Sequence, residues 1–158
     1  MKIGIIVHSQ TGNTYSVAEK LKEKLLEAGH SVNIERIKPV GGEKTNEKDV
    51  SRIRIEKLPD VNSYDALVFG APVQGASVSP VLAAYLTQVA SLQNKKVACL
   101  VTEFFPYPWM GGTRAINQMK KVCESKGASV CGTGIVNWSS IGREKKITDV
   151  VEQLSSLF

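Results

Sequence analysis

The sequence lacks any long hydrophobic run. No apolar stretch approaches the roughly 20 residues that a membrane-spanning helix needs, so we expect no membrane span. The short apolar run after Met1 leads directly into a polar loop without a small-residue cleavage site, which argues against an export signal. Cysteine pairs are missing too, because Cys99, Cys123 and Cys131 are an odd number and are not spaced like a zinc or disulfide framework. We therefore expect a cytoplasmic protein whose cysteines are small buried hydrophobic residues.

Two common phosphate-binding motifs are absent as well. The chain has no GxxxxGK[ST] loop, which nucleotide hydrolysis needs, and no GxGxxG after its first predicted strand, which Rossmann-type dinucleotide binding needs. Arginine and lysine are dispersed and are not interleaved with aromatic residues, so we expect no nucleic-acid binding. The net charge of +5 favours acidic partners through electrostatic steering. A length of 158 residues suits one domain, and we expect residues 1–158 to form it.

Apolar runs alternate along the chain with segments of helical spacing. The runs predict buried strands at residues 2–7, 31–37, 64–70, 96–102 and 130–136. The segments between them predict amphipathic helices, of which the second begins at Ser79 as N-cap with Pro80 in its first turn and runs to about residue 90. The apolar positions expected to face the core in the other three helices are Val17, Leu21, Leu25 and Ala28, then Ile116, Met119 and Val122 or Cys123, then Ile147, Val150, Val151, Leu154 and Leu157.

Alternating strands and helices predict an α/β fold with helices on both faces of a parallel sheet. Five strands fit the doubly wound order 2-1-3-4-5, in which ligands bind beyond the carboxyl ends of the strands where the order reverses. We therefore expect the site in the loops after the first, third and fourth strands. Residues 38–62 fit this pattern poorly. We interpret them as a surface connection, solvent-facing and mobile around residues 41–50, with residues 52–56 able to pair as an extra strand.

The loop after the first strand has the composition of an anion site. It consists of Ser9, Gln10, Thr11, Gly12, Asn13 and Thr14 and leads into a predicted helix, whose first amides and positive dipole end attract anions. The loop contains no Lys or Arg. Neutral donors suit a phosphate that is bound permanently, because no group is placed to stabilise a migrating phosphoryl charge.

SQTGNT resembles the phosphate loop of the flavodoxin family, which has a hydroxyl residue, any residue, then Thr-Gly-any-Thr. The strand and loop YDALVFGAPVQG and the order of elements extend this resemblance over nearly the whole chain, residues 38–62 excepted. The resemblance implies a flavodoxin-like fold with FMN as cofactor. It also implies that Ala71, Pro72, Val73, Gln74 and Gly75 run along the ribityl chain and one ring edge, and that the Gly75 peptide can turn over toward the flavin N5.

The loop after the fourth strand is unusually aromatic. It begins at Thr102 and Glu103, continues as FFPYPWM and ends at Gly111 and Gly112. Aromatic residues in a loop indicate a ligand or partner, and we expect Phe104 and Trp109 to stack on the flavin, with Thr102, Glu103 and Gly111 also at the cofactor. Typical electron-carrier flavodoxins are acidic overall and have an acidic, glycine-rich stretch at this place. The ring contacts are therefore the least transferable part of the resemblance.

Three functions remain open from the sequence. The first is electron transfer by FMN between a reductase and an acceptor enzyme, which needs no catalytic acid, base or nucleophile and no metal. The second is an FMN-dependent NAD(P)H:quinone or flavin reductase, which the aromatic loop and positive charge favour. The third is a flavin-free regulatory module, but a phospho-receiver needs acidic residues where this chain has His8 and Gly70. We interpret His8 as a structural histidine.

Overall fold

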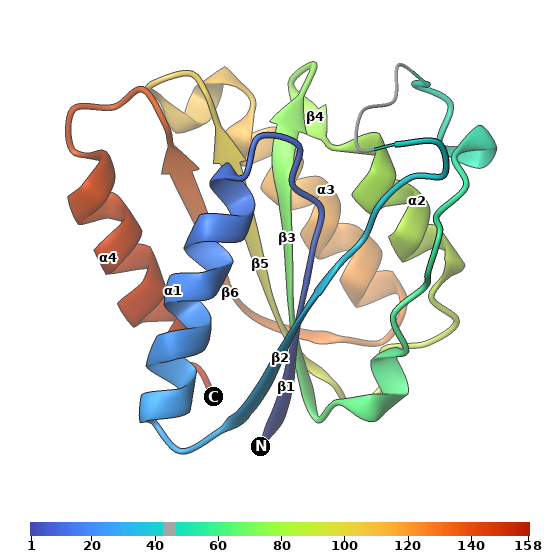
Figure 1. The fold of residues 1–158 in the computed structure, drawn as a ribbon, viewed down its shortest axis with the longest axis horizontal. Helices are drawn as coiled ribbons and strands as arrows, with labels where there is room; N and C mark the ends of the chain where they lie inside the picture. Colours follow the sequence, from blue (N-terminus) through green and yellow to red (C-terminus); the bar gives the residue numbers. More distant parts are fainter. Residues whose placement is uncertain (43–46) are drawn as a thin grey trace.

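A parallel sheet runs through the middle of the molecule between two pairs of helices (Figure 1). The computed structural model describes residues 1–42 and 47–158. Five parallel strands have the order β2-β1-β3-β5-β6, and a short strand, β4, adds to β3. This order confirms the predicted doubly wound sheet and places β2 at its edge. In chain order the elements are β1 (Lys2–Val7), α1 (Asn13–Glu27), β2 (Ser31–Arg36), η1 (Val50–Arg52), η2 (Val61–Ser63), β3 (Ala66–Gln74), β4 (Ser77–Val78), α2 (Pro80–Gln88), β5 (Lys96–Glu103), η3 (Pro108–Met110), α3 (Gly112–Ser125), β6 (Ser129–Asn137) and α4 (Arg143–Ser155).

The central strands are apolar because both of their faces are buried. In β5, Val97 and Val101 join a cluster that contains the inner faces of α2 and α3. Ala98 and Leu100 point the other way, into a cluster with α1 and α4. Burial on both faces fixes the register of β1, β3 and β5, because a slip by one residue would exchange the two sets of side chains. The carboxyl ends of these three strands are therefore held side by side.

The segment predicted as the loop after the third strand is strand and hairpin instead. β3 continues to Gln74 and pairs with β4 through Val73 with Val78 and Gln74 with Ser77. The two residues between them, Gly75 and Ala76, have φ values of +59° and +61°, the signature of a tight hairpin turn. The prediction failed because Pro72 and Gly75 indicate a loop locally, whereas Pro72 is tolerated here at the end of the pairing with β5. The segment still lies at the expected edge of the sheet.

Most predicted core positions are buried, with two differences at element ends. Ala28 is exposed because α1 ends at Glu27, and Ala18 faces the core instead. Leu157 lies beyond the end of α4. Of the two alternatives in α3, Cys123 is the buried residue and Val122 is only partly buried. α2 ends at Gln88, slightly before the predicted end, and its N-cap is confirmed by the Ser79 hydroxyl, which accepts a hydrogen bond from the Leu82 N–H at 3.2 Å. Cys99 and Cys123 are buried as predicted, whereas Cys131 is only partly buried.

The region between β2 and β3 is more than a surface connection. Ile53 and Val61 are buried in the cluster on the α2 side, and Pro39 forms a single antiparallel bridge with Ile55. The predicted extra strand at residues 52–56 is thus reduced to one bridge. Within the segment 41–50, predicted to be solvent-facing and mobile, residues 43–46 lie outside the described residues. Described residues 41, 42, 48 and 49 are exposed.

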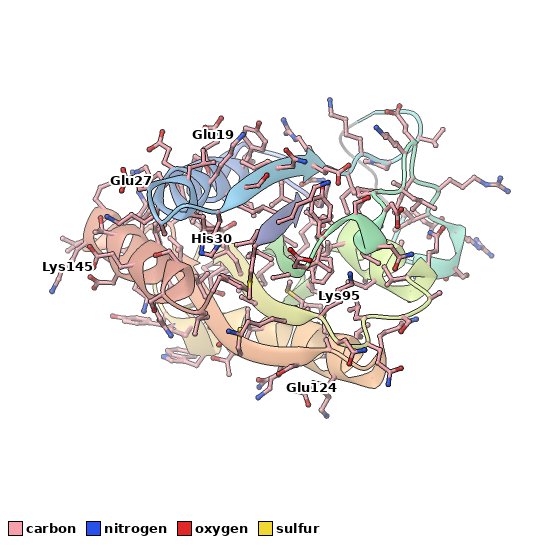
Figure 2. The ribbon with its side chains drawn as sticks, turned by 90° about the horizontal axis from the view of Figure 1, so that it is seen from below. Glu19, Glu27, His30, Lys95, Glu124 and Lys145 are labelled. Atoms are coloured by element: carbon pink, nitrogen blue, oxygen red, sulfur yellow. The ribbon has the colours of Figure 1, made fainter. Side chains whose placement is uncertain are left out.

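The opposite end of the sheet carries scattered charges. Figure 2 looks at the amino ends of the strands, where Glu27 and Glu124 lie near the ends of α1 and α3, and Lys95 directly precedes β5. In the described part of the chain, no helix has the length and apolar character to cross a membrane, and no group of three or more potential metal-ligating side chains comes together.

Candidate functional site

A cavity of about 200 Å³ lies where β1, β3 and β5 end. Its walls come from the loop after β1, from the end of β3 and from the end of β5. Every lining residue was expected at the site from the sequence: Gln10, Thr11, Asn13, Pro72, Val73, Gln74, Thr102, Glu103 and Phe104. The volume is below the roughly 300–1,000 Å³ of typical small-molecule sites. The cavity is therefore large enough for only one part of a ligand of that size.

Residues Ser9–Thr14, which we call the hydroxyl loop, are shaped by one buried side chain. The Ser9 hydroxyl oxygen accepts hydrogen bonds from the N–H of Gly12 at 3.1 Å and of Tyr15 at 3.3 Å. Gly12 has a φ of +89°, which any residue with a Cβ adopts only under strain. Ser9 and Gly12 thus bend the chain so that the start of α1 faces the cavity.

Unsatisfied amides gather at this bend. Within residues 1–42 and 47–158, the N–H groups of Thr11, Asn13 and Thr14 donate to no acceptor. They belong to or directly precede the first turn of α1, where the helix dipole leaves about half a positive charge. Amides of this kind are the usual donors to a bound phosphate or other anion. The geometry therefore fits the anion site predicted from the sequence.

Two side-chain hydrogen bonds connect the three walls. The Thr14 and Thr102 hydroxyls are 2.8 Å apart and are both buried, which ties the start of α1 to the end of β5. The Gln74 side-chain amide donates to the Gln10 side-chain oxygen at 2.7 Å, which ties the end of β3 to the hydroxyl loop. The three walls therefore form one connected unit.

Arg36 is a residue that the sequence analysis missed. It is the last residue of β2, next to β1, and its guanidinium donates to the Ser9 carbonyl at 2.6 Å and lies 5.4 Å from the centre of the Tyr15 ring. The hydroxyl loop itself has no cation, but the structure places one against it. The available signal was the predicted pairing of the first two strands, which brings their ends together.

Glu103 is the buried acid of the site. Its side chain is 3% exposed, its Oε1 accepts a hydrogen bond from the Asn137 side-chain amide, and the Gly112 N–H also interacts with the carboxylate. Its other oxygen, Oε2, is buried without a hydrogen-bond partner in the described chain. Burial raises the pKa of the Glu103 carboxyl, and the bonds from Asn137 and Gly112 only partly offset this effect.

Residues Phe104–Met110, which we call the aromatic loop, face solvent. Phe104 is 71% exposed and lines the cavity, whereas Trp109 is 75% exposed and does not. The Trp109 ring stacks on Tyr107 with centroids 5.7 Å apart. It borders a separate groove of about 550 Å³, whose other residues lie on α3: Thr113, Arg114, Asn117, Gln118 and Lys121. Of the two predicted aromatic contacts, the structure brings only Phe104 to the cavity.

The other predicted residues surround the cavity without lining it. Ser9 and Thr14 are buried beneath it and Ala71 lies fully inside the core. Gly75 is at the tip of the hairpin, and Gly111 packs so closely on Ala76 that an added Cβ would lie 3.0 Å from the Ala76 Cα. His8 is buried and shares a hydrogen bond of 2.7 Å with the Ser79 hydroxyl, in agreement with the structural interpretation.

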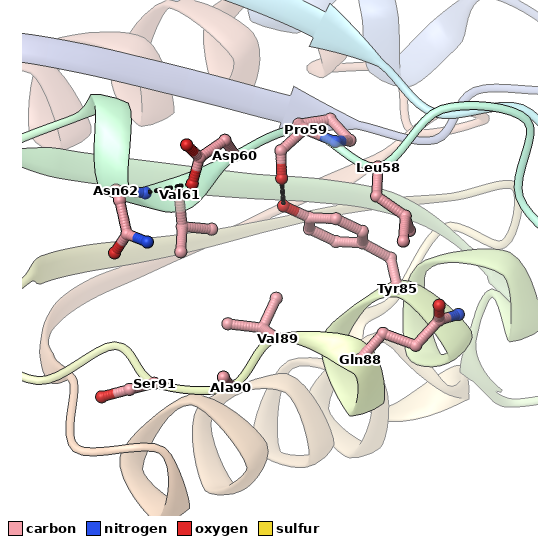
Figure 3. Close-up of a pocket in the computed structure, with 10 residues that line it drawn as sticks. All are labelled: Leu58, Pro59, Asp60, Val61, Asn62, Tyr85, Gln88, Val89, Ala90 and Ser91. Carbon is pink, nitrogen blue, oxygen red and sulfur yellow. Dashed lines mark hydrogen bonds between the residues drawn. The ribbon is translucent and has the colours of Figure 1, made fainter.

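A second cavity, of about 220 Å³, lies away from this edge (Figure 3). It is formed by the segment that enters β3 and by the end of α2. The Tyr85 hydroxyl donates to the Pro59 carbonyl at 2.7 Å, so the one buried polar tip in its wall is satisfied. Asp60 accepts a hydrogen bond from the Asn62 N–H at 2.9 Å in a local cap. Both polar groups are used by the fold, and the carboxyl edge remains the candidate site.

The chain is similar to known flavoproteins in sequence and in structure. The family model described as "NADPH-dependent FMN reductase" matches residues 1–142. A flavodoxin from Megasphaera elsdenii is 30% identical over 140 residues, which cover 85% of each chain. The solved structure of flavodoxin 2 from Bacillus cereus covers 100% of both chains with a TM-score of 0.71 at 18% identity. An azoreductase from Bacillus anthracis str. Sterne covers 99% of this chain and 98% of its own, with a TM-score of 0.68 at 15% identity.

Proposed function

Because the chain belongs to the flavodoxin-like family of FMN-binding proteins, we propose that it is an electron carrier that uses FMN to pass electrons from a reductase to an acceptor enzyme. The flavin ring supplies the redox chemistry when it is bound. The protein's part is to hold the cofactor, limit its contact with water and set its potential. The observation that carries the proposal is the set of unsatisfied amides in the hydroxyl loop beside a cavity at the switch point of the sheet.

The hydroxyl loop is the part that would hold the phosphate. Its free N–H groups at Thr11, Asn13 and Thr14 supply donors, and the exposed Thr11 side chain adds a hydroxyl. Arg36 supports the loop from outside through the Ser9 carbonyl. Hydrogen bonds to a charged group contribute roughly 1.5–3 kcal/mol each, so a few of them suffice for stable binding of an anion.

The flavin ring would lie against the other two walls. Pro72, Val73 and Gln74 approach it from the end of β3, and the exposed Phe104 offers an aromatic face from β5. Glu103 is the single ionisable residue among those that line the cavity, all of which are described, and it is not paired with a nucleophile or a base. A site with this composition binds and orients a cofactor, which favours an electron carrier.

Comparing FMN with riboflavin tests the proposed phosphate contact directly. Riboflavin has the same ring and ribityl chain without the phosphate. Titration of the FMN-free protein, followed by quenching of flavin fluorescence, is expected to give tight binding of one FMN and at least 100-fold weaker binding of riboflavin, about 2.7 kcal/mol. Equal affinities for both would contradict the role of the hydroxyl loop, and no binding of either would contradict the proposed function.

A second candidate is a reductase that oxidises NAD(P)H directly and reduces a quinone or a free flavin. The groove between Trp109 and α3 supports it, because an aromatic ring and two cations, Arg114 and Lys121, suit a planar anionic ligand. The match to a family described as NADPH-dependent supports it too.

The rate of NADPH oxidation separates the two candidates. An electron carrier loaded with FMN is expected to oxidise NADPH slowly unless a separate flavoprotein reductase is added. A reductase is expected to turn over many equivalents of NADPH by itself when a quinone such as menadione is present. The assay follows absorbance at the NADPH band, with FMN alone as the control.

A further inference from the structure

Glu103 has a feature that cofactor binding alone does not explain. A buried carboxyl is costly to ionise unless both of its oxygens are hydrogen-bonded. Here Oε1 accepts a hydrogen bond from Asn137, whereas Oε2 is buried without a hydrogen-bond partner among the described residues. The fold therefore holds this side chain in place through one oxygen and leaves the other available. Glu103 also lines the cavity, so any charge placed there lies close to it.

Among the described residues, no charged side chain contributes to the raised pKa of Glu103. From β6 it meets Asn137, and from the start of α3 it meets the Gly112 amide. Two cations lie on neighbouring elements. Arg114 in the first turn of α3 is exposed, and Arg143 at the start of α4 donates to the Trp138 carbonyl at 2.9 Å. Neither is among the causes that shift the Glu103 pKa, which are burial, Asn137 and Gly112.

We propose that protonation of Glu103 is coupled to the charge in the cavity. The carboxylate binds a proton from solvent when negative charge is added in the cavity and releases the proton when that charge is removed. The inference rests on the proposed function, because the added charge is the electron that a bound FMN accepts from a reductant such as dithionite. The proton forms an O–H bond at Oε2, and the carboxylate becomes a neutral carboxylic acid. No other bond in the protein forms or breaks.

The direction of the coupling follows from like-charge repulsion. An ionised Glu103 beside an anionic ligand costs free energy, and proton uptake removes this cost. Asn137 is an amide that donates to Oε1 whether or not Oε2 carries a proton, so the side chain need not move between the two states. Glu103 thus binds and releases a proton beside the cavity and does not itself accept or donate electrons.

Glu103→Gln is the central variant, because it mimics the neutral acid in shape and keeps an oxygen for Asn137 and Gly112. The midpoint potential of the bound FMN is measured between pH 5 and 9 by spectroelectrochemistry. The midpoint potential reports the ratio of the affinities for reduced and oxidised FMN. In the wild type, this ratio is expected to fall by up to tenfold per pH unit within the window where Glu103 titrates. The variant is expected to lose this contribution, while proton uptake at other groups remains common to both proteins. Glu124→Gln, an exposed change at the far end of α3, is the control and is expected to match the wild type.

A second readout observes the acid itself. The reduced-minus-oxidised infrared spectrum of the wild type is expected to show a protonated carboxyl band that is absent in Glu103→Gln. If that variant does not fold, Glu103→Asp is used, with the expectation that the band shifts in frequency. Parallel potential-against-pH curves for wild type and Glu103→Gln, or an infrared band that survives the substitution unchanged, would overturn the inference. These outcomes are distinct from failure of the wild type to bind FMN, which would overturn the proposed function instead.

The FMN-free protein gives an independent check of the same group. Because the folded-state pKa of Glu103 is raised above its unfolded value, the folded state binds more protons between the two values. Stability is therefore fully present below the unfolded pKa and falls as pH rises through the folded pKa. The difference in unfolding free energy between Glu103→Gln and wild type is expected to grow in favour of the variant over this window, and a constant difference would contradict the inference.

Discussion

The hydroxyl loop and the aromatic loop follow two strands, β1 and β5, at the same edge of the sheet, but different contacts hold them in place. The hydroxyl loop is held from inside, by the buried Ser9 and by the Thr14 bond to Thr102. The aromatic loop is held through its backbone, because the Asn137 side-chain amide donates to the Phe105 carbonyl and the Ser139 N–H to the Phe104 carbonyl, and it leaves its rings exposed. One loop presents backbone donors to a ligand, and the other presents side-chain faces.

This difference assigns different roles to the two loops. Fixed backbone amides recognise a group that is the same in every cycle, such as a phosphate, and cost little reorganisation on binding. Exposed aromatic side chains can adapt to a ring or to a passing partner. We therefore expect cofactor affinity to depend mainly on the hydroxyl loop, and contacts with electron donors or acceptors to depend mainly on the aromatic loop.

The largest effect is expected from Gly12→Ala in the hydroxyl loop. At a φ of +89° an added Cβ meets nothing within 4 Å but strains the backbone, by about 1 kcal/mol. Relief of this strain moves the amides that follow, so FMN affinity is expected to fall at least tenfold, about 1.4 kcal/mol. The fluorescence titration described above measures it.

Gly29→Ala is a matched control for this change. Gly29 follows the other end of α1, has a φ of +92°, and an added Cβ there also meets nothing within 4 Å. Denaturant unfolding of the FMN-free proteins is expected to show similar losses of stability, about 1 kcal/mol, in both variants. A loss of FMN affinity in Gly29→Ala equal to that in Gly12→Ala would show that general strain, and not loop geometry, controls binding.

The next effect concerns the buried pair Thr14 and Thr102, which joins the hydroxyl loop to the end of β5, just before the aromatic loop. Thr14→Val or Thr102→Val alone leaves the partner hydroxyl buried without a hydrogen bond, which costs about 1–2 kcal/mol of unfolding free energy. The double variant removes both hydroxyls and is expected to cost little more than either single change. Unfolding in urea for all four proteins gives the coupling energy, expected near 1 kcal/mol. Additive losses would mean that the two hydroxyls act independently.

The two loops also differ in how well the sequence predicts them. The hydroxyl loop is a local motif between a continuous apolar strand and an amphipathic helix, so its position and its role as a helix start follow from neighbouring residues. β1, β5 and β6 are predicted within a residue or so, because strands buried on both faces are apolar throughout. The lining of the cavity follows from the same logic, since parallel strands end at one edge.

Other features depend on contacts that are distant in sequence. Arg36 reaches the site only because β2 pairs with β1. β3 continues past Pro72 because β5 and β4 offer partners, although proline and glycine locally indicate a loop. Trp109 has the composition of a stacking residue, but η3 turns it toward α3 and away from the cavity. In each case the position of the residue depends on a side-chain direction or on a strand-pairing partner. Neither can be predicted from a short segment of the sequence.

A smaller effect is expected at Phe104, the residue of the aromatic loop that lines the cavity beside the hydroxyl loop. Phe104→Ala removes the ring that lines the cavity, and Phe105→Ala removes the ring that packs edge-on against it with centroids 5.9 Å apart. Stacking contacts contribute about 0.5–1.5 kcal/mol, so FMN affinity is expected to fall about 2- to 10-fold in Phe104→Ala. Phe105→Ala is expected to change affinity less than twofold, and since both rings are exposed, neither should change stability by more than about 0.5 kcal/mol. Equal losses in the two variants would place the ring contact elsewhere.

The smallest effect on the cofactor is expected from Trp109→Ala, and it bears on the choice between the two proposed functions. Trp109 lies outside the cavity, so FMN affinity should change less than about twofold, a difference of roughly 0.4 kcal/mol or less. If the protein is a reductase, the loss of the aromatic wall beside Arg114 and Lys121 should raise the KM for NADPH while kcat stays near its wild-type value, because binding far from the reacting atoms contributes equally to ground and transition states. Tyr107→Ala, which removes the stacking partner but not the groove wall, should have a weaker effect on KM. A large loss of FMN in Trp109→Ala would instead mean that the aromatic loop folds over the cofactor, and the separation of roles between the two loops would no longer hold.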